Sequence, residues 1–386
     1  MALESRHFDT NAPVSPAPND KRRAVQPGWA LCLSGGGFRA MVFHLGVLWR
    51  LNDAGILSKL DRISSVSGGS ITAGMLGLKW DKLVFDAEGV ASNLLEEVIR
   101  PLRRLGGQTV DVPAIVAGLL LPWTSIGRRV EAAYRRHLFG TATLQSLPVR
   151  PRFVINATSL QSGVLWRFMR PYMRDYRVGQ VPAPTVSLAR AVAASSAFPP
   201  FLSPVRLDFA EGEVIAGNNA ELGHKPYTRR ALLTDGGVYD NLGLETAWKR
   251  YETILVSDAG ARMEPAPRPW RLWSAQAFRV LNVIDSQVRS LRKRQLIEAY
   301  EAKRRMGAYW GIRTNIADYE LADVLPCPHE RTVKLAEIPT RLKKLPADLQ
   351  ERLINWGYAV CDAALRKHLD PPPALPKDFP FPLRGV

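Results

Sequence analysis

The sequence predicts an α/β fold with a central, mainly parallel sheet that is flanked by helices. Two observations support this prediction: short apolar runs alternate with stretches of helical periodicity, and glycine-rich turns follow several of these runs. The chain has 386 residues, of which 46% are hydrophobic, so it can bury a substantial core. No linker-like composition interrupts its middle, and a single domain is therefore expected.

The expected elements follow in chain order. We predict strands over residues 29–34, 61–66, 152–157, 231–234 and 253–258, with a further strand within 165–172. We predict irregular helical structure over residues 81–148 and helices over 38–52, 71–78, 187–197, 243–250 and 270–307, followed by short helices from the end of the last one to about residue 369. Gly55 and the Pro199-Pro200 pair mark two of the helix ends.

The two ends of the chain differ in composition from the middle. Residues 1–28 are rich in proline and charge and predict a flexible N-terminal arm, whereas residues 370–386 form a proline-rich tail. The arm has no apolar core of a signal peptide, which favours a cytoplasmic location. The apolar run over residues 113–123 is shorter than the roughly 20 residues that span a membrane. It suits a buried core helix better than a lid or a membrane-dipping segment.

The charge balance points to a polyanionic partner. The 52 Lys and Arg residues outnumber the 36 Asp and Glu residues and give a net charge of +16, which attracts nucleic acid or an anionic membrane surface. No nucleic-acid-binding motif is present, so nucleic acid is not predicted. The three cysteines have no paired spacing, so neither a disulfide framework nor a metal site is expected.

Ser67 lies at the apex of a predicted strand-to-helix turn. Such a turn exposes the serine hydroxyl and directs the N-terminus of the next helix at the reaction centre. The small neighbours Ser65, Gly68 and Gly69 permit the turn, although Ser65 stands where the Gly-x-Ser-x-Gly pattern has glycine. Ser67 therefore suits a nucleophile, with a helix cap as the simpler alternative.

A glycine run follows the first predicted strand. The N–H groups of Gly35, Gly36 and Gly37 suit an anion. A dinucleotide site would need an acidic residue after a second strand, and a phosphate-binding loop would need Gly-Lys-Ser/Thr; both are absent. We expect an oxyanion hole, with Arg39 either anchoring the loop or meeting a lipid phosphate.

The base has two possible origins. Asp235 ends a predicted strand before two glycines, and it could accept the Ser67 proton directly in a Ser-Asp dyad without histidine. In a Ser-His-Asp arrangement, His329, in a predicted loop, or His368 would follow Asp235 in the chain. His44 and His137 lie in helical patterns and are expected to be structural.

Four motifs in order resemble those of the patatin-like phospholipase family: Gly-Gly-Gly-x-Arg, Ser-x-Ser-Gly-Gly-Ser, Ala-Ser-Ser-Ala-Phe-Pro at 194–199, and Asp-Gly-Gly-x-x-x-Asn at 235–241. The likeness covers roughly residues 29–260. It implies a three-layer patatin-type fold and one catalytic domain over 29–369, with a motif core over 29–260 and a helical part over 261–369. It also implies that Ser67 is the nucleophile, Asp235 its base, and the glycine loop with Arg39 the oxyanion hole.

The resemblance further implies a lipid acyl hydrolase of the phospholipase A or lysophospholipase type that needs no metal or other cofactor. Its substrate would be a phospholipid or another lipid ester, and peripheral association with an anionic membrane is expected. The basic stretch over residues 289–305 could contact head groups, although a solvated helix face fits it better. The alternatives are an esterase or thioesterase that uses His329, a signal-activated membrane-degrading effector, and a non-hydrolytic lipid-binding protein.

Overall fold

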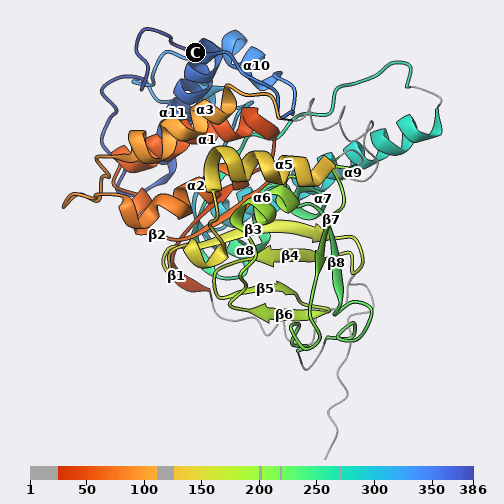
Figure 1. The fold of residues 1–386 in the computed structure, drawn as a ribbon. Helices are drawn as coiled ribbons and strands as arrows, with labels where there is room; N and C mark the ends of the chain where they lie inside the picture. The colour runs from red at the N-terminus through yellow and green to blue at the C-terminus, as the bar shows by residue number, and fades with distance from the viewer. Residues whose placement is uncertain (1–24, 111–125, 200–201, 218–219, 270–271) are drawn as a thin grey trace, which may run out of the picture.

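The computed structural model describes residues 25–110, 126–199, 202–217, 220–269 and 272–386. A ten-stranded sheet runs through it in the order β10-β9-β1-β2-β3-β4-β5-β6, with β8 pairing to both β3 and β7 (Figure 1). The strands are β1 (Gln26–Leu33), β2 (Leu60–Val66), β3 (Arg152–Ser159), β4 (Leu165–Phe168), β5 (Tyr172–Asp175), β6 (Gly179–Pro182), β7 (Val205–Asp208), β8 (Arg230–Asp235), β9 (Tyr251–Asp258) and β10 (Met306–Gly311).

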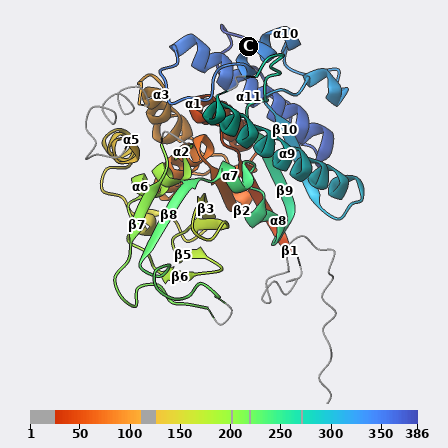
Figure 2. The ribbon, with the colours of Figure 1, turned by 90° about the vertical axis from the view of Figure 1, so that its right-hand side faces the viewer.

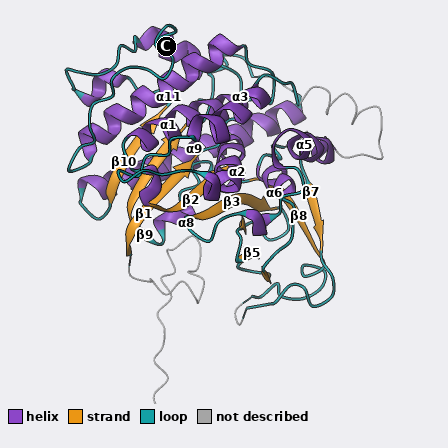
Figure 3. Cartoon of the chain, turned by 60° about the vertical axis from the view of Figure 1, so that its left-hand side comes forward, coloured by secondary structure: helices purple, strands orange, loops and turns teal. Residues whose placement is uncertain are grey.

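The helices cover both faces of the parallel part of this sheet (Figure 3). They are α1 (Gly37–Asp53), α2 (Gly68–Lys79), α3 (Arg100–Gly106), α5 (Ile126–Tyr134), α6 (Leu188–Ser195), α7 (Gly237–Asp240), α8 (Glu245–Trp248), α9 (Trp273–Glu301), α10 (His329–Ala336) and α11 (Ala347–His368). Strands β10, β9, β1, β2 and β3 are mutually parallel, whereas β4 to β8 pair antiparallel. The predicted fold class, a mainly parallel sheet between helices, is therefore confirmed.

The alternation of side chains along β1 shows why the sheet is buried on both faces. Leu31 and Leu33 enter the larger core with α1, α2 and α11. Ala30 and Cys32 face the other way and enter a smaller core with α8 and with Leu296 of α9. Figure 2 shows α8 and α9 on that side of the sheet. The result is three layers.

The structure differs from the sequence prediction in the middle and in the C-terminal third of the chain. The helix expected over 270–307 ends at Glu301, and Met306–Gly311 forms β10 beside β9. The short helices expected before residue 369 include α11, a 22-residue helix whose middle is buried. The region 165–172 splits between β4 and β5, and β6 and β7 were not predicted. His329 begins α10 instead of lying in a loop. The apolar run at 113–123 lies outside the described residues.

The C-terminal segment 370–386 lies against α1 and α11. Arg50 donates to the carbonyl of Ala374, and Asn355 donates to the carbonyls of Phe381 and Gly385. Phe379 and Val386 are buried. None of the helices that the structure describes is long and apolar enough to cross a membrane.

Candidate active site

Strand register brings Ser67 and Asp235 together. Val66 at the end of β2 pairs with Asn156, and the next residue of β3, Ala157, pairs with Asp235 at the end of β8. Ser67 directly follows Val66, so the two side chains meet at one edge of the sheet. The Ser67 hydroxyl is close enough to the Asp235 carboxylate to lower its pKa.

Ser67 occupies a strained turn between β2 and α2. Its φ of 51° and ψ of −119° are unusual for a residue with a side chain. Its own N–H donates to the Ser195 hydroxyl at 3.0 Å. The turn leaves the Ser67 side chain partly exposed at the N-terminus of α2, as expected of a nucleophile elbow.

Asp235 is 2% exposed. Its pKa is raised to about 7, chiefly because the carboxylate is buried. The Gly237 N–H and the Ser67 hydroxyl lower the pKa, and the charge of Asp285 raises it. The Gly237 N–H lies 2.7 Å from the carboxylate. A carboxylate with a pKa near neutrality can accept and return a proton under physiological conditions.

The glycine loop contacts the serine turn directly. A Cβ at Gly68 would lie 2.2 Å from the carbonyl oxygen of Gly37, and one at Gly35 would lie 3.1 Å from the Ser67 Cβ. Gly36 and Gly37 have φ values of 147° and 62°, which favour glycine. Side chains at these positions would push the two turns apart.

The three glycines of the loop differ in whether their backbone N–H groups are hydrogen bonded. The Gly35 N–H donates to the Asn241 carbonyl at 3.1 Å, so it is already engaged. The N–H groups of Gly36, Gly37 and Gly68 have no hydrogen-bond acceptor within the described residues. Gly36 and Gly37 of the predicted loop therefore remain as donors for an oxyanion, and Gly68 of the serine turn joins them in place of Gly35.

Arg39 anchors the glycine loop from inside the protein. Its guanidinium is buried and donates to the carbonyls of Ala259, Ala336 and Ile338 and to the Thr340 hydroxyl. Burial lowers its pKa to about 10, which leaves it charged at neutral pH. Of the two roles expected for Arg39, these contacts match the anchoring one.

A serine network beneath the elbow was not predicted. The Ser70 hydroxyl contacts those of Ser65 and Ser195 at 3.0 and 2.9 Å, and Ser195 donates to the Asn156 carbonyl at 2.6 Å. Ser65, which replaces the elbow glycine, is fully buried and bonds to the Val154 carbonyl. The motif at 194–199 could have suggested Ser195, but its partners Ser67 and Ser70 lie more than a hundred residues away in the chain.

In the part of the chain that the structure describes, no histidine hydrogen-bonds to Ser67 or Asp235. His44 is buried between the Ser257 hydroxyl and the Ser34 carbonyl, and burial lowers its pKa to about 4. His368 lies beside Tyr319. His329 lines a separate cavity.

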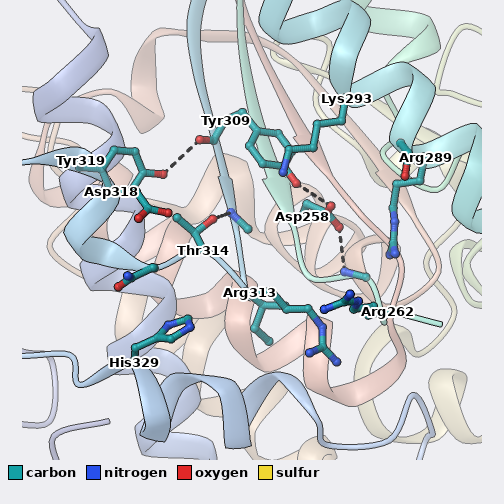
Figure 4. A pocket seen from close by; sticks show the side chains of 15 residues that line it. Asp258, Arg262, Arg289, Lys293, Tyr309, Arg313, Thr314, Asp318, Tyr319 and His329 are labelled. Atoms are coloured by element: carbon teal, nitrogen blue, oxygen red, sulfur yellow. Dashed lines mark hydrogen bonds between the residues drawn. The ribbon is translucent and has the colours of Figure 1, made fainter. Parts of the chain in front are cut away.

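That cavity of about 580 Å³ lies beyond β9, between α9 and β10, and neither Ser67 nor Asp235 lines it (Figure 4). The described residues contain no cluster of His, Cys, Asp and Glu that could hold a metal ion. Much of the basic stretch at 289–305 is used within the protein: Arg292 pairs with Glu245, and Arg305 lies over Trp248.

The family model described as patatin-like phospholipase matches residues 31–248, more than half of the chain. No curated protein matches the sequence. Among solved structures, human GIVD cytosolic phospholipase A2 with methyl γ-linolenyl fluorophosphonate is 15% identical with a TM-score of 0.49, over 87% of this chain and 57% of that one.

Another structure of the human enzyme is 15% identical with a TM-score of 0.41, over 64% of this chain and 48% of that one. VipD from Legionella pneumophila is 15% identical with a TM-score of 0.33, over 92% of this chain and 68% of that one. The match thus spans about half the length of the human phospholipase structures.

Proposed function

Because the chain belongs to the patatin-like phospholipase family, we propose that it is a lipid acyl hydrolase of the phospholipase A or lysophospholipase type. Ser67 is the nucleophile and Asp235 the general base. The observation that carries this proposal is the strand register that places the partly exposed Ser67 beside Asp235, a buried carboxylate whose pKa is raised to about 7. The substrate is a phospholipid or another lipid ester.

The reaction follows from the positions of these groups. The Ser67 oxygen attacks the ester carbonyl carbon while its proton passes to Asp235. The N–H groups of Gly36, Gly37 and Gly68 stabilise the oxyanion that forms. The C–O bond to the leaving alcohol then breaks, and Asp235 returns the proton to that oxygen. Water, deprotonated by Asp235, then adds to the acyl carbonyl carbon. The C–O bond to Ser67 breaks, Asp235 returns the proton to the Ser67 oxygen, and the fatty acid leaves.

The N-terminal half of α9 supports a peripheral membrane contact. Trp273 is 78% exposed and Leu272 58% exposed, and further exposed apolar side chains follow along the helix: Phe278, Val280, Leu281, Val283 and Ile284. This part of α9 projects from the body (Figure 1). The rings of Phe278 and Phe198 meet edge to face, with their centroids 6.2 Å apart. Phe198 follows Ala197, whose carbonyl accepts a hydrogen bond from the Asp235 N–H. An apolar helix beside the dyad suits entry of a lipid from a membrane surface.

Two substitutions test the dyad. We expect Ser67→Ala and Asp235→Asn each to lower fatty-acid release from phospholipid vesicles by about a thousandfold or more. Labelling by a fluorophosphonate probe should be lost in Ser67→Ala and kept in Ser92→Ala, a matched serine on the surface. Wild-type turnover in either dyad variant would refute the mechanism.

A third variant separates the dyad from a histidine-dependent esterase. His329→Ala should keep near-normal turnover, because His329 lines a cavity that excludes Ser67 and Asp235. A His329→Ala protein as inactive as Ser67→Ala would support the histidine-dependent esterase instead. A wild-type protein that the probe does not label and that releases no fatty acid would indicate a non-hydrolytic lipid-binding protein.

A further inference from the structure

The cavity of about 580 Å³ beyond β9 is lined by cationic side chains from separate segments (Figure 4). Arg262 comes from the loop after β9, Arg289 and Lys293 from α9, and Arg313 from the loop after β10. We propose that this cavity is a binding site for a phosphate-bearing anion, distinct from the catalytic dyad. The phosphate could belong to a lipid head group or to a soluble phosphorylated compound.

The charges of the cavity are not balanced by its own carboxylates. Asp258 and Asp318 are the acidic residues of the lining, against the four cations. The Asp258 carboxylate already accepts from the Tyr309 hydroxyl at 2.8 Å and the Gly260 N–H at 2.9 Å. In the described part of the chain, Arg262, Arg289 and Lys293 form no ion pair, and the pair of Arg313 with Glu264 is long, at 3.8 Å. Lys293 lies over the Tyr309 ring at 4.4 Å.

Two guanidinium groups have buried donors without a partner among the described residues. These are Nη1 of Arg289 and Nε of Arg313. Arg289 is held in place through its other terminal nitrogen, which donates to the Ala261 carbonyl. Buried donors on a cation are costly to leave unpaired, so the protein alone does not fully satisfy these two guanidinium groups.

The size and chemistry of the site favour a phosphate group that is attached to a larger molecule. A volume of about 580 Å³ is in the range of small-molecule sites and far exceeds a single inorganic phosphate. Planar guanidinium groups bind phosphate oxygens in pairs, and a lysine adds a point charge. A monocarboxylate could engage only a small part of these donors.

The cavity also adjoins the segment that anchors the glycine loop. Asp258 and Gly260 of its wall flank Ala259, whose carbonyl accepts from Arg39 at 2.9 Å. A Cβ at Gly36 would lie 2.7 Å from that carbonyl oxygen. An anion held by Arg289 and Arg313 would therefore sit behind the segment that anchors the glycine loop.

The test is a binding experiment with a charge-matched control. The pocket variant is Arg262→Gln with Lys293→Gln, and the control is Arg268→Gln with Arg294→Gln, which removes two exposed charges from the same loop and helix outside the lining. The soluble arm measures binding of inorganic pyrophosphate by calorimetry. The lipid arm measures cosedimentation with phosphatidylcholine vesicles that contain phosphatidic acid, compared with oleic acid as a phosphate-free anion. All proteins carry Ser67→Ala, so the result does not depend on hydrolysis.

We expect the pocket variant to weaken binding in at least one arm by about tenfold or more, and the control to keep it within about twofold. Loss confined to phosphatidic acid vesicles identifies a lipid head group, and loss confined to pyrophosphate identifies a soluble ligand. The proposal is overturned if neither probe binds, if the control weakens binding as much as the pocket variant, or if oleic acid vesicles respond like phosphatidic acid vesicles. None of these outcomes bears on the dyad, which fluorophosphonate labelling tests separately.

Discussion

At the scale of single residues, burial of Asp235 sets the working pH of the proposed enzyme. The base must be ionised, and burial raises its pKa to about 7. We therefore expect kcat/KM to rise with pH through a midpoint near 7, falling about tenfold per pH unit below it.

Asp285 of α9 tunes that midpoint, because its charge raises the Asp235 pKa. Asp285→Asn should move the midpoint of the same pH profile down by about half a pH unit, whereas Glu301→Gln, an exposed acid at the end of the same helix, should leave it in place. A midpoint near 4 in the wild type, or no shift in Asp285→Asn, would contradict this account.

The same burial destabilises the fold. The ordinary pKa of Asp235 is 3.8, so between about pH 4 and 7 the folded protein holds a proton that the unfolded chain has released. The Asp235 contribution to stability therefore declines as pH rises through that window and stays low above it. We expect Asp235→Asn to be more stable than wild type at pH 8 by about 3 kcal/mol, with the difference vanishing near pH 4. Urea denaturation at the two pH values measures this; equal stability at pH 8 would refute it.

Single residues also show which parts of the site could be read from the sequence. Ser67, Asp235 and the glycine loop belong to short local motifs whose backbone requirements limit them to a few residue types. The engagement of Gly35 by Asn241, and of Ser67 by Ser195, depends on which loops the fold brings together. Neither contact leaves a local pattern, so neither was predicted.

At the scale of elements, α9 combines a projecting apolar half with a half that is tied to the body by Arg292 and Leu296. Each large apolar side chain that enters a membrane contributes about 2 kcal/mol. We expect Trp273→Ser with Val280→Ser to weaken binding to phosphatidylcholine vesicles by about a hundredfold, measured by flotation in the Ser67→Ala background.

The matched control is Val84→Ser with Leu375→Ser, two exposed apolar residues outside α9. This control should bind vesicles as the parent does. An equal loss in both pairs would show that general surface hydrophobicity, and not α9, carries the contact.

Two elements were missed for different physical reasons. Strand β10 is stabilised by parallel pairing with β9, and a Cβ at Gly307 would lie 1.9 Å from the Ile254 carbonyl oxygen. Helix α11 is apolar on several sides because it is buried, so it lacks the one-sided pattern of a surface helix. Its Gly357 permits close approach to α1, where a Cβ would lie 2.1 Å from the Phe43 carbonyl oxygen.

At the scale of the whole molecule, the parallel strands that carry the motifs were predictable, and the parts that enclose them were not. The strands themselves were predicted from apolar runs with tight turns, whereas their order, β9-β1-β2-β3, comes from the structure and brings the loop after β1 beside the turn after β2. The segment that anchors the glycine loop was not predicted: residues 336–340 hold Arg39. The residues after 260 thus stabilise a candidate site whose own residues all precede residue 260 in the sequence.

The C-terminal segment is the last of these supports. Phe379 is only 6% exposed, and Phe381 lies beside Trp49 and under the guanidinium of Arg103. Because the segment contacts both α1 and α11, disrupting its packing should lower the free energy of unfolding. We expect Phe379→Ala to lower the free energy of unfolding by about 3 kcal/mol, and Leu383→Ala, which is 99% exposed, to change it by less than about 0.5 kcal/mol. Guanidinium denaturation compares the two; a Phe379→Ala protein as stable as wild type would show that the segment does not support the domain.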